Sequence, residues 1–146
     1  EKSEKLRKDN TIANVSLYKS YIEKLPFADS SFDVVISNGV INLCPDKDKV
    51  FSEIARVLKP KGRMVIADIV TEKQLPERVV CNSTLWAACI GGASQQDNFK
   101  SSIERAGLKV THMKTNDSYE FISESAKDAS MDYGVKSISL RAEKNI

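Results

Sequence analysis

Residues 25–70 read LPFADSSFDVVISNGVINLCPDKDKVFSEIARVLKPKGRMVIADIV, and their pattern predicts the centre of the fold. Within them, residues 32–38 (FDVVISN) are mostly apolar and rich in β-branched side chains, which predicts a strand buried on both faces. Residues 46–58 carry apolar side chains at helical spacing, and the proline and glycine of residues 59–62 end that helix. Residues 63–70 (RMVIADIV) predict a second buried strand. A strand, a helix and a parallel strand in this order form the crossover unit of an open α/β sheet.

The rest of the chain predicts further helices and strands around this unit. They are a helix end at 1–9, a strand at 14–22, a helix at 94–106, a strand at 108–115, a helix at 117–129 and a last strand at 135–142. Ser94 and Asp97 have the spacing of a capping box, with Asp in place of Glu, and so predict the start of the helix at 94–106. The last strand is expected to run antiparallel to its neighbour.

Composition narrows the class of protein. The chain has 146 residues, of which 41% are hydrophobic and 29% charged, as in one globular domain. The net charge of +2, without a basic cluster interleaved with aromatic residues, argues against nucleic acid as a partner. No apolar run approaches the ~20 residues that cross a membrane, and we expect no signal peptide. Three cysteines without a dense framework indicate a reducing, cytoplasmic setting.

Two motifs in this chain resemble a known enzyme class. The pattern LPF-x-D-x-SFD-V at residues 25–34, followed by RVLKPKGR at 56–63, is similar to the middle of class I S-adenosylmethionine-dependent methyltransferases. SNGVINLCPDK at 37–47, together with WAACIGGA at 86–93, more narrowly resembles the arsenite methyltransferases. The resemblance covers residues 21–110. It implies a Rossmann-like α/β fold, a mostly parallel sheet with an antiparallel C-terminal strand, and S-adenosylmethionine as cofactor.

The same resemblance implies that this domain is incomplete. A complete enzyme of the class begins with a strand that ends in a G-x-G-x-G turn, and a second strand follows that ends in an acidic residue. The six glycines here stand at 39, 62, 91, 92, 107 and 134, and none forms such a turn. We therefore predict that residues 1–146 are a partial methyltransferase domain without the first two strands. An exposed strand edge is a template for association, so a homo-oligomer of this chain is also expected.

The cofactor's adenine is expected at the turn after the strand at 14–22. By the resemblance, Tyr21, Ile22 and Glu23 occupy that turn, where an apolar side chain packs on the ring face and polar groups read the ring edge. The competing interpretation is that Ile22 and Leu25 are simply part of the core.

The cofactor's methionine end is expected at the carboxyl end of the strand at 32–38. Ligands of open α/β sheets bind outside this end of the strands. By the resemblance, Asn38, Gly39 and Val40 line this part of the site, and Leu43 lies in the loop that partly covers it. The amide of Asn38 both donates and accepts hydrogen bonds, and Gly39 permits a positive φ angle. The competing interpretation is that Asn38 and Gly39 only form a turn.

By the resemblance, residues 71–93 are expected to form the lid over the substrate. Leu85, Cys89 and Ala93 are spaced to share one helical face. By the resemblance, Cys89 matches a cysteine whose thiolate binds trivalent arsenic, so it is the expected catalytic residue and arsenic(III) ligand. Soft sulfur ligands suit this thiophilic element. The competing interpretation is that Cys89 is a small core residue, as buried cysteines often are.

Several features leave the acceptor open. Many arsenite methyltransferases have a cysteine where Gly39 stands, and no cysteine follows Cys89. Cys44 and Cys81 remain candidates for further thiol ligands. We interpret Asp68 as a capped or solvent-facing carboxylate rather than a group that faces the substrate.

The sequence therefore predicts methyl transfer from S-adenosylmethionine to a small molecule, with an arsenite-like thiophilic acceptor favoured. A quinone precursor or another small molecule is the alternative within the same class. A non-catalytic, self-associating remnant of the fold is the alternative from another class.

Overall fold

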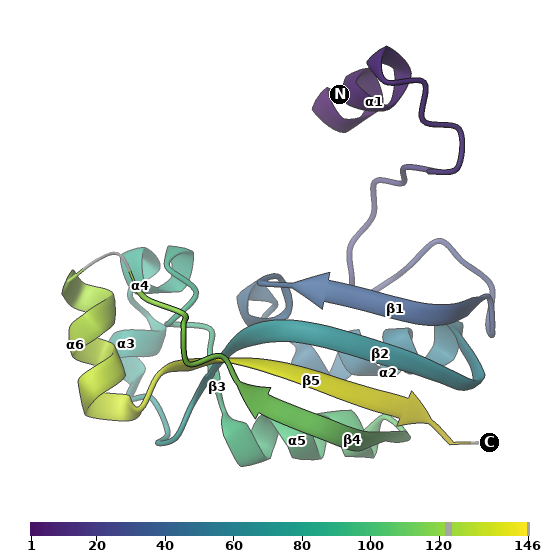
Figure 1. Ribbon diagram of the computed structural model, residues 1–146. Helices are drawn as coiled ribbons and strands as arrows, with labels where there is room; N and C mark the ends of the chain where they lie inside the picture. Colours follow the sequence, from purple (N-terminus) through teal and green to yellow (C-terminus); the bar gives the residue numbers. More distant parts are fainter. Residues whose placement is uncertain (122–123, 146) are drawn as a thin grey trace.

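The computed structural model is an α/β fold with one mixed sheet (Figure 1), and it describes residues 1–121 and 124–145. Its elements are α1 (Lys2–Asp9), β1 (Phe32–Asn38), the 3₁₀ helix η1 (Ile41–Leu43), α2 (Lys47–Val57), β2 (Leu58–Thr71), α3 (Glu77–Val80), α4 (Ser83–Ala87), β3 (Ser94–Gln95), α5 (Gln96–Arg105), β4 (Leu108–Thr115), α6 (Glu124–Tyr133) and β5 (Lys136–Lys144). Over the described residues, every helix is too short or too polar to pass through a lipid bilayer.

The sheet is built around the long strand β2. The order of strands is β1-β2-β5-β4, and the short β3 pairs with the end of β2. β2 runs parallel to β1 and to β3, whereas β5 is antiparallel to both β2 and β4. The predicted crossover unit and the antiparallel last strand are therefore confirmed. The carboxyl end of β1 lies beside β2, with Asn38 opposite Ala67, four residues before β2 ends at Thr71.

One face of the sheet carries the main core. Helices α2 and α5 cover this face, and the rings of Phe51 and Phe99 meet edge to face with centroids 5.3 Å apart. Both helices turn an apolar stripe inward because their apolar residues recur at helical spacing. Met64 and Ile66 of β2 face them, and this core fixes the position of β2.

A second, smaller core forms where β2 leaves the sheet. It gathers Ile69, Val79, Ile90 and Ala129, which come from β2, α3, the segment after α4, and α6. Figure 1 shows α3, α4 and α6 grouped at this end of the sheet. The predicted lid region at 71–93 therefore packs on its own cluster.

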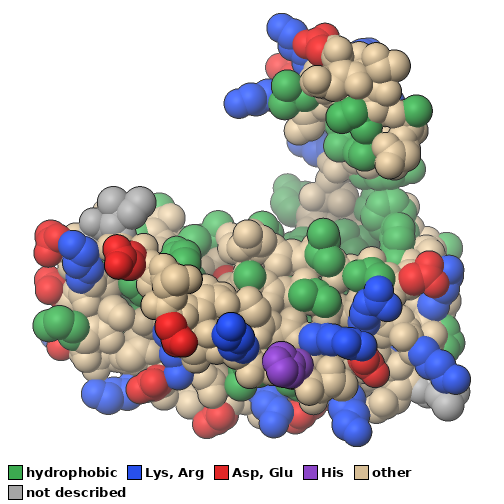
Figure 2. All heavy atoms as spheres, viewed as in Figure 1, with side chains coloured by type: hydrophobic (Ala, Val, Ile, Leu, Met, Phe, Trp, Pro, Cys, Tyr) green, Lys and Arg blue, Asp and Glu red, His purple; other side chains and the backbone are tan. Residues whose placement is uncertain are grey.

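The prediction that β1 is buried on both faces is wrong for the described structure. Val34 is 37% exposed and Ile36 is 78% exposed, although Val35 between them packs on the main core. Val65 of β2 lies beside Ile36 and is exposed as well. In the described part of the chain no layer covers this second face and no strand pairs with the outer edge of β1. Figure 2 shows hydrophobic side chains gathered over β1 and the segment that leads to it.

The predicted strand at 14–22 is also wrong. Residues 14–20 have no regular structure, and a single bridge joins Tyr21 to Lys24. An extended segment becomes a strand only when a neighbour takes up its backbone hydrogen bonds, and no described strand lies beside this one. Helix α1, which confirms the helix predicted at 1–9, and the segment after it stand away from the sheet (Figure 1).

Three element boundaries differ from the predictions. The KPKG at residues 59–62 does not form a separate turn but belongs to β2, whose pairing with β1 is irregular at this point. Gln95, and not Ser94, caps α5, because its side-chain oxygen accepts the N–H groups of Asp97 and Asn98. The helix predicted at 117–129 is displaced to α6, since residues 117–121 are not helical; residues 122–123 lie outside the described part.

Candidate functional site: the carboxyl edge of the sheet

The backbone is open to a ligand just after β1. Gly39 has φ 65°, and a Cβ atom built on it would meet nothing within 4 Å. Its N–H donates to the carbonyl of Ala67 (2.9 Å), which joins the turn to the end of β2. Asn38 and Val40 on either side are exposed. This short segment offers an amide, an apolar side chain and free space at the edge where open α/β sheets bind ligands.

A largely apolar hollow of about 490 Å³ runs along β1 from this edge. Three of the predicted cofactor residues, Ile22, Asn38 and Val40, line it. Tyr21 and Glu23 line a neighbouring hollow of about 590 Å³ on the other side of the turn. Gly39 and Leu43 line neither hollow, although Leu43 is 38% exposed on η1. The structure therefore brings Ile22 together with the end of β1 and places Tyr21 and Glu23 beside them.

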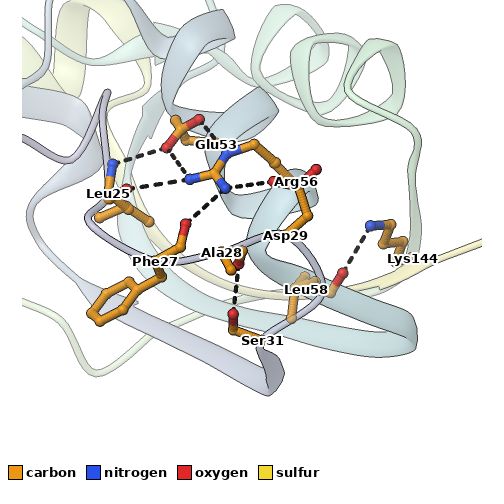
Figure 3. A network of polar contacts seen from close by, with 9 residues as sticks. All are labelled: Leu25, Phe27, Ala28, Asp29, Ser31, Glu53, Arg56, Leu58 and Lys144. Carbon is orange, nitrogen blue, oxygen red and sulfur yellow. Dashed lines mark hydrogen bonds and ion pairs between the residues drawn. The ribbon is translucent and has the colours of Figure 1, made fainter.

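A network of polar contacts holds the segment that carries Ile22 (Figure 3). Arg56 of α2 donates to the carbonyl oxygens of Leu25 (3.2 Å) and Phe27 (2.8 Å) and to the carboxylate of Asp29 (2.7 Å). Glu53 accepts the backbone N–H of Leu25 (2.8 Å). These contacts attach residues 25–29 to one helix face, so the turn before them has a fixed anchor.

The two charged members of this network also bind each other. Arg56 donates two hydrogen bonds to the two carboxylate oxygens of Glu53, at 2.8 and 2.9 Å. The hydrogen bonds from Arg56 and the N–H of Leu25 hold the pKa of Glu53 at about 2, below its ordinary value of 4.5. Bidentate pairs of this kind are among the stronger polar contacts in proteins.

A buried carboxylate lies at the end of β2. Asp68 is 2% exposed and accepts the N–H of Asn42 (3.1 Å) and of Ile69 (2.8 Å). Burial raises the pKa of Asp68 above its ordinary range. The interpretation of a solvent-facing side chain is thus wrong, whereas that of a capped carboxylate is confirmed, because Asp68 is buried and accepts two backbone N–H groups.

Cys89 occupies an unusual backbone position. Helix α4 ends at Ala87, so Cys89 lies beyond it, and the predicted helical face shared by Leu85, Cys89 and Ala93 is wrong. The N–H of Cys89 binds the carbonyl of Trp86, and the N–H of Ile90 binds that of Leu85. This is the Schellman arrangement, whose residue in the left-handed conformation is usually glycine. Here it is Cys89, with φ 66°.

The side chain of Asn42 joins this cysteine to the sheet edge. Asn42 lies on η1 and is fully buried, and its Nδ2 donates to the carbonyl of Cys89 (2.9 Å). Gly92 approaches the same residue, since a Cβ atom on Gly92 would stand 2.0 Å from the carbonyl oxygen of Asn42. The glycine at position 92 therefore allows close backbone packing between this loop and η1.

The three cysteines differ in accessibility. Cys89 is half-buried, Cys81 is exposed, and Cys44 is buried against the main core, where burial raises the pKa of its thiol. In the described residues no three His, Cys, Asp or Glu side chains come close enough together to hold a metal ion. Two cysteines are connected to the carboxyl edge of the sheet. The thiol of Cys44 donates to the carbonyl of Val40 (3.6 Å), and the backbone carbonyl of half-buried Cys89 accepts the Nδ2 of Asn42 (2.9 Å).

Sequence reasoning missed Asn42, Glu53 and Arg56. One signal for Asn42 was available, since it is a polar residue between Ile41 and Leu43, four positions after the end of the strand at 32–38. The Glu53–Arg56 pair has the spacing of a helical surface pair, and nothing in the sequence indicates that it binds the backbone of a distant loop.

Comparison with known proteins identifies the class of protein to which this fold belongs. The family model described as "Methyltransferase domain" matches residues 1–107, so the chain belongs to this methyltransferase family. The predicted resemblance and the Rossmann-like fold are therefore confirmed. The predicted absence of two strands remains a prediction.

Several of the proteins that this chain resembles are arsenite methyltransferases. The arsenite methyltransferase of Halobacterium salinarum is 38% identical over 135 residues, which are 92% of this chain and 34% of that protein. The crystal structure of CrArsM, an arsenic(III) S-adenosylmethionine methyltransferase from Chlamydomonas reinhardtii, matches with a TM-score of 0.68 and 30% identity, over 87% of this chain and 42% of that one. A ubiquinone/menaquinone biosynthesis C-methyltransferase of Haemophilus ducreyi is 44% identical over 66 residues, 44% of this chain and 25% of that protein. This chain thus spans about a third of the length of the first of these relatives.

Proposed function

We propose that this chain forms part of an S-adenosylmethionine-dependent methyltransferase whose acceptor is trivalent arsenic. The observation that carries the proposal is the connection between Cys89 and the segment after β1, made by the buried side chain of Asn42. The similarity to two arsenite methyltransferases over most of this chain supports the same acceptor. Since the chain spans only part of those relatives, the proposed activity is that of a protein that also supplies the other side of the cofactor site.

The residues present fit one side of S-adenosylmethionine. Ile22 and Val40 offer apolar surface in the hollow, Asn38 offers an amide, and Gly39 leaves its backbone open at positive φ. This set suits a ligand with a flat ring and a polar amino-acid end. We further propose that Tyr21, Glu23 and Leu43 border the same ligand. When bound, the cofactor supplies an electrophilic methyl group on a sulfonium sulfur.

In this proposal Cys89 holds the acceptor. Its thiolate binds arsenic(III), as suits a soft ion. Held there, arsenic would present its lone pair to the methyl carbon that the cofactor would supply, and the electrons of the carbon–sulfur bond would remain on the cofactor's sulfur. The protein contributes orientation and exclusion of water rather than a strong base. The same proposal places the protein in the cytoplasm, where its three free thiols stay reduced.

Trp86, three residues before Cys89, gives a local readout of arsenic binding. We expect arsenite, with glutathione supplying its remaining thiolate ligands, to change the fluorescence of this single tryptophan in the unmodified chain and in Cys81→Ala. In Cys89→Ala the change should be lost. An equal response of Cys89→Ala and the unmodified chain would contradict the proposed role of Cys89. Calorimetric titration with S-adenosylhomocysteine tests the cofactor side separately.

A quinone precursor remains the alternative acceptor. Methylation of a quinone carbon needs no thiol ligand, so Cys89→Ala would leave turnover of such a substrate unchanged in a protein with the complete cofactor site. Turnover of arsenite by the same variant should collapse.

The exposed edge of β1 favours a second, non-catalytic candidate function, self-association. Ile36 is 78% exposed beside an edge that no described strand pairs with, and such an edge is a template for another chain. We expect a homodimer or larger assembly by light scattering, and Ile36→Lys should shift it toward the monomer. A monomeric mass over a broad concentration range would exclude this function.

A further inference from the structure

Asn42 links two parts of the site that are distant in the sequence. Its backbone N–H donates to the Oδ2 atom of Asp68 (3.1 Å), and its Nδ2 donates to the carbonyl of Cys89 (2.9 Å). It lies on η1, which directly follows the segment of Asn38 and Gly39. One buried residue thus connects the end of β2, the turn after β1 and the loop that bears the thiol.

The hydrogen bonding of the Asn42 side chain only partly offsets the free-energy cost of burying its amide group. The Oδ1 atom of Asn42 is buried and has no hydrogen-bond partner. A buried polar atom without a partner is destabilising, and an apolar side chain of the same shape avoids that cost. The favourable side-chain contact that the structure shows for Asn42 is therefore its bond to Cys89.

The backbone of Cys89 needs such a restraint. A residue with a Cβ atom is disfavoured at φ 66°, and it stays there only where the surroundings hold it. The Schellman hydrogen bonds hold Cys89 from the side of α4, and Asn42 holds it from the side of the sheet. The direction of the Cys89 side chain follows from this backbone conformation.

We propose that Asn42 is a positioning residue, which holds Cys89 in its left-handed backbone conformation and so fixes the thiol relative to the turn after β1. Its relevance to methyl transfer rests on the proposed function of Cys89. The restraint itself is a property of this chain, and it is measured without substrate or cofactor.

The test compares Asn42→Leu with Thr71→Val. Leu has the shape of Asn but can make no bond to Cys89, and it also removes the unpartnered oxygen. Thr71 is the matched control, since it is equally buried and its Oγ1 atom also lacks a partner. The measurements are the alkylation rates of the three cysteines with iodoacetamide, resolved by mass spectrometry, and the ¹³C chemical shifts of Cys89. Exposed Cys81 is the internal reference, and buried Cys44 reports on the main core.

In Asn42→Leu we expect the rate of Cys89 relative to Cys81 to rise about fivefold or more, from the loss of a buried hydrogen bond. The carbon shifts of Cys89 should lose the signature of positive φ, while Cys44 stays protected. Thr71→Val should change neither measurement. An unchanged Cys89 in Asn42→Leu would overturn the proposal, and so would an equal rise at Cys44, because Asn42 would then act through overall stability alone.

A second variant covers the case in which Asn42→Leu does not fold. Asn42→Ser is smaller and too short to reach the carbonyl of Cys89, and the same rise at Cys89 alone is expected. Failure of arsenite to bind the unmodified chain would contradict the proposed function and leave these alkylation rates interpretable.

Discussion

The two sides of the candidate site are held in different ways. Residues 25–29, next to the hollow along β1, are attached to α2 by several hydrogen bonds to Glu53 and Arg56. The loop of Cys89 is attached to the sheet edge by one side-chain hydrogen bond, from Asn42. The first attachment uses charged groups and a relaxed helix, whereas the second holds a residue in a disfavoured backbone conformation.

This difference has a physical consequence. Several hydrogen bonds join residues 25–29 to the charged side chains of Glu53 and Arg56. If one of these bonds is lost, the others still hold the segment on α2. The Cys89 loop has one side-chain hydrogen bond to the sheet edge, and its other contacts are the Schellman hydrogen bonds to α4 and apolar packing on the second core. We therefore expect the cofactor side to be the rigid part of the site and the Cys89 loop to be the part whose position is easily changed.

The largest expected effect comes from adding a methyl group at Gly92, in the loop that carries Cys89. In Gly92→Ala the new methyl group would stand 2.0 Å from the carbonyl oxygen of Asn42 and must push the loop away from η1. We expect the free energy of unfolding to fall by about 3 kcal/mol, as measured by urea denaturation.

Gly39→Ala is the matched control on the first side. Gly39 has free space around it but a positive φ angle, so alanine should cost only about 1 kcal/mol from backbone strain. Equal losses in the two variants would show that the loop does not pack on η1 as described.

The next largest expected effect is a dependence of the free energy of unfolding on pH, and it comes from Glu53. The folded pKa of Glu53 is about 2, below its ordinary value of 4.5, so the contribution of this carboxylate is complete above about pH 4.5. This contribution to stability should be lost as the pH falls from 4.5 toward 2, because the unfolded chain binds a proton at Glu53 more readily than the folded protein does. Thermal unfolding over this range should show stability falling with the pH.

Glu53→Gln provides the comparison for this acid limb. It should lower the free energy of unfolding by about 1.5 kcal/mol at pH 7 and flatten the decline below pH 4.5. Burial shifts the pKa of Asp68 in the opposite direction, so Asp68 should partly offset the decline. An unchanged acid limb in Glu53→Gln would assign the acid sensitivity to other carboxylates.

The smallest expected effect is a gain in stability when glycine replaces Cys89, a change that also removes the thiol. Glycine relieves the left-handed strain at position 89 but costs more entropy on folding, so Cys89→Gly should gain about 0.5 kcal/mol. Cys81→Gly is the control, because Cys81 has φ −81° and glycine there should destabilise. The same sign of change in both variants, measured by urea denaturation, would contradict the strain at Cys89.

Local pattern was sufficient to predict the centre of the fold. The apolar runs of β1 and β2 and the helical spacing of α2 placed these elements within a few residues, because strands and helices of a core repeat their apolar residues with different periods. The strand expected at 14–22 failed for the complementary reason. Its residues alternate as a strand would, yet a strand also needs a neighbour, which no local pattern supplies.

Patterns along the chain were enough to predict the α/β class and the parallel β1–β2 pair, whereas the roles of the segments at 38–40 and 86–93 stay predictions. Only the tertiary structure showed that Asn42 binds Cys89 and that Arg56 binds the loop at 25–29. These contacts join residues 47 and 31 positions apart, and they depend on where the core places whole elements. Periodicity is a property of neighbours along the chain, whereas a hydrogen bond between distant segments is decided by packing.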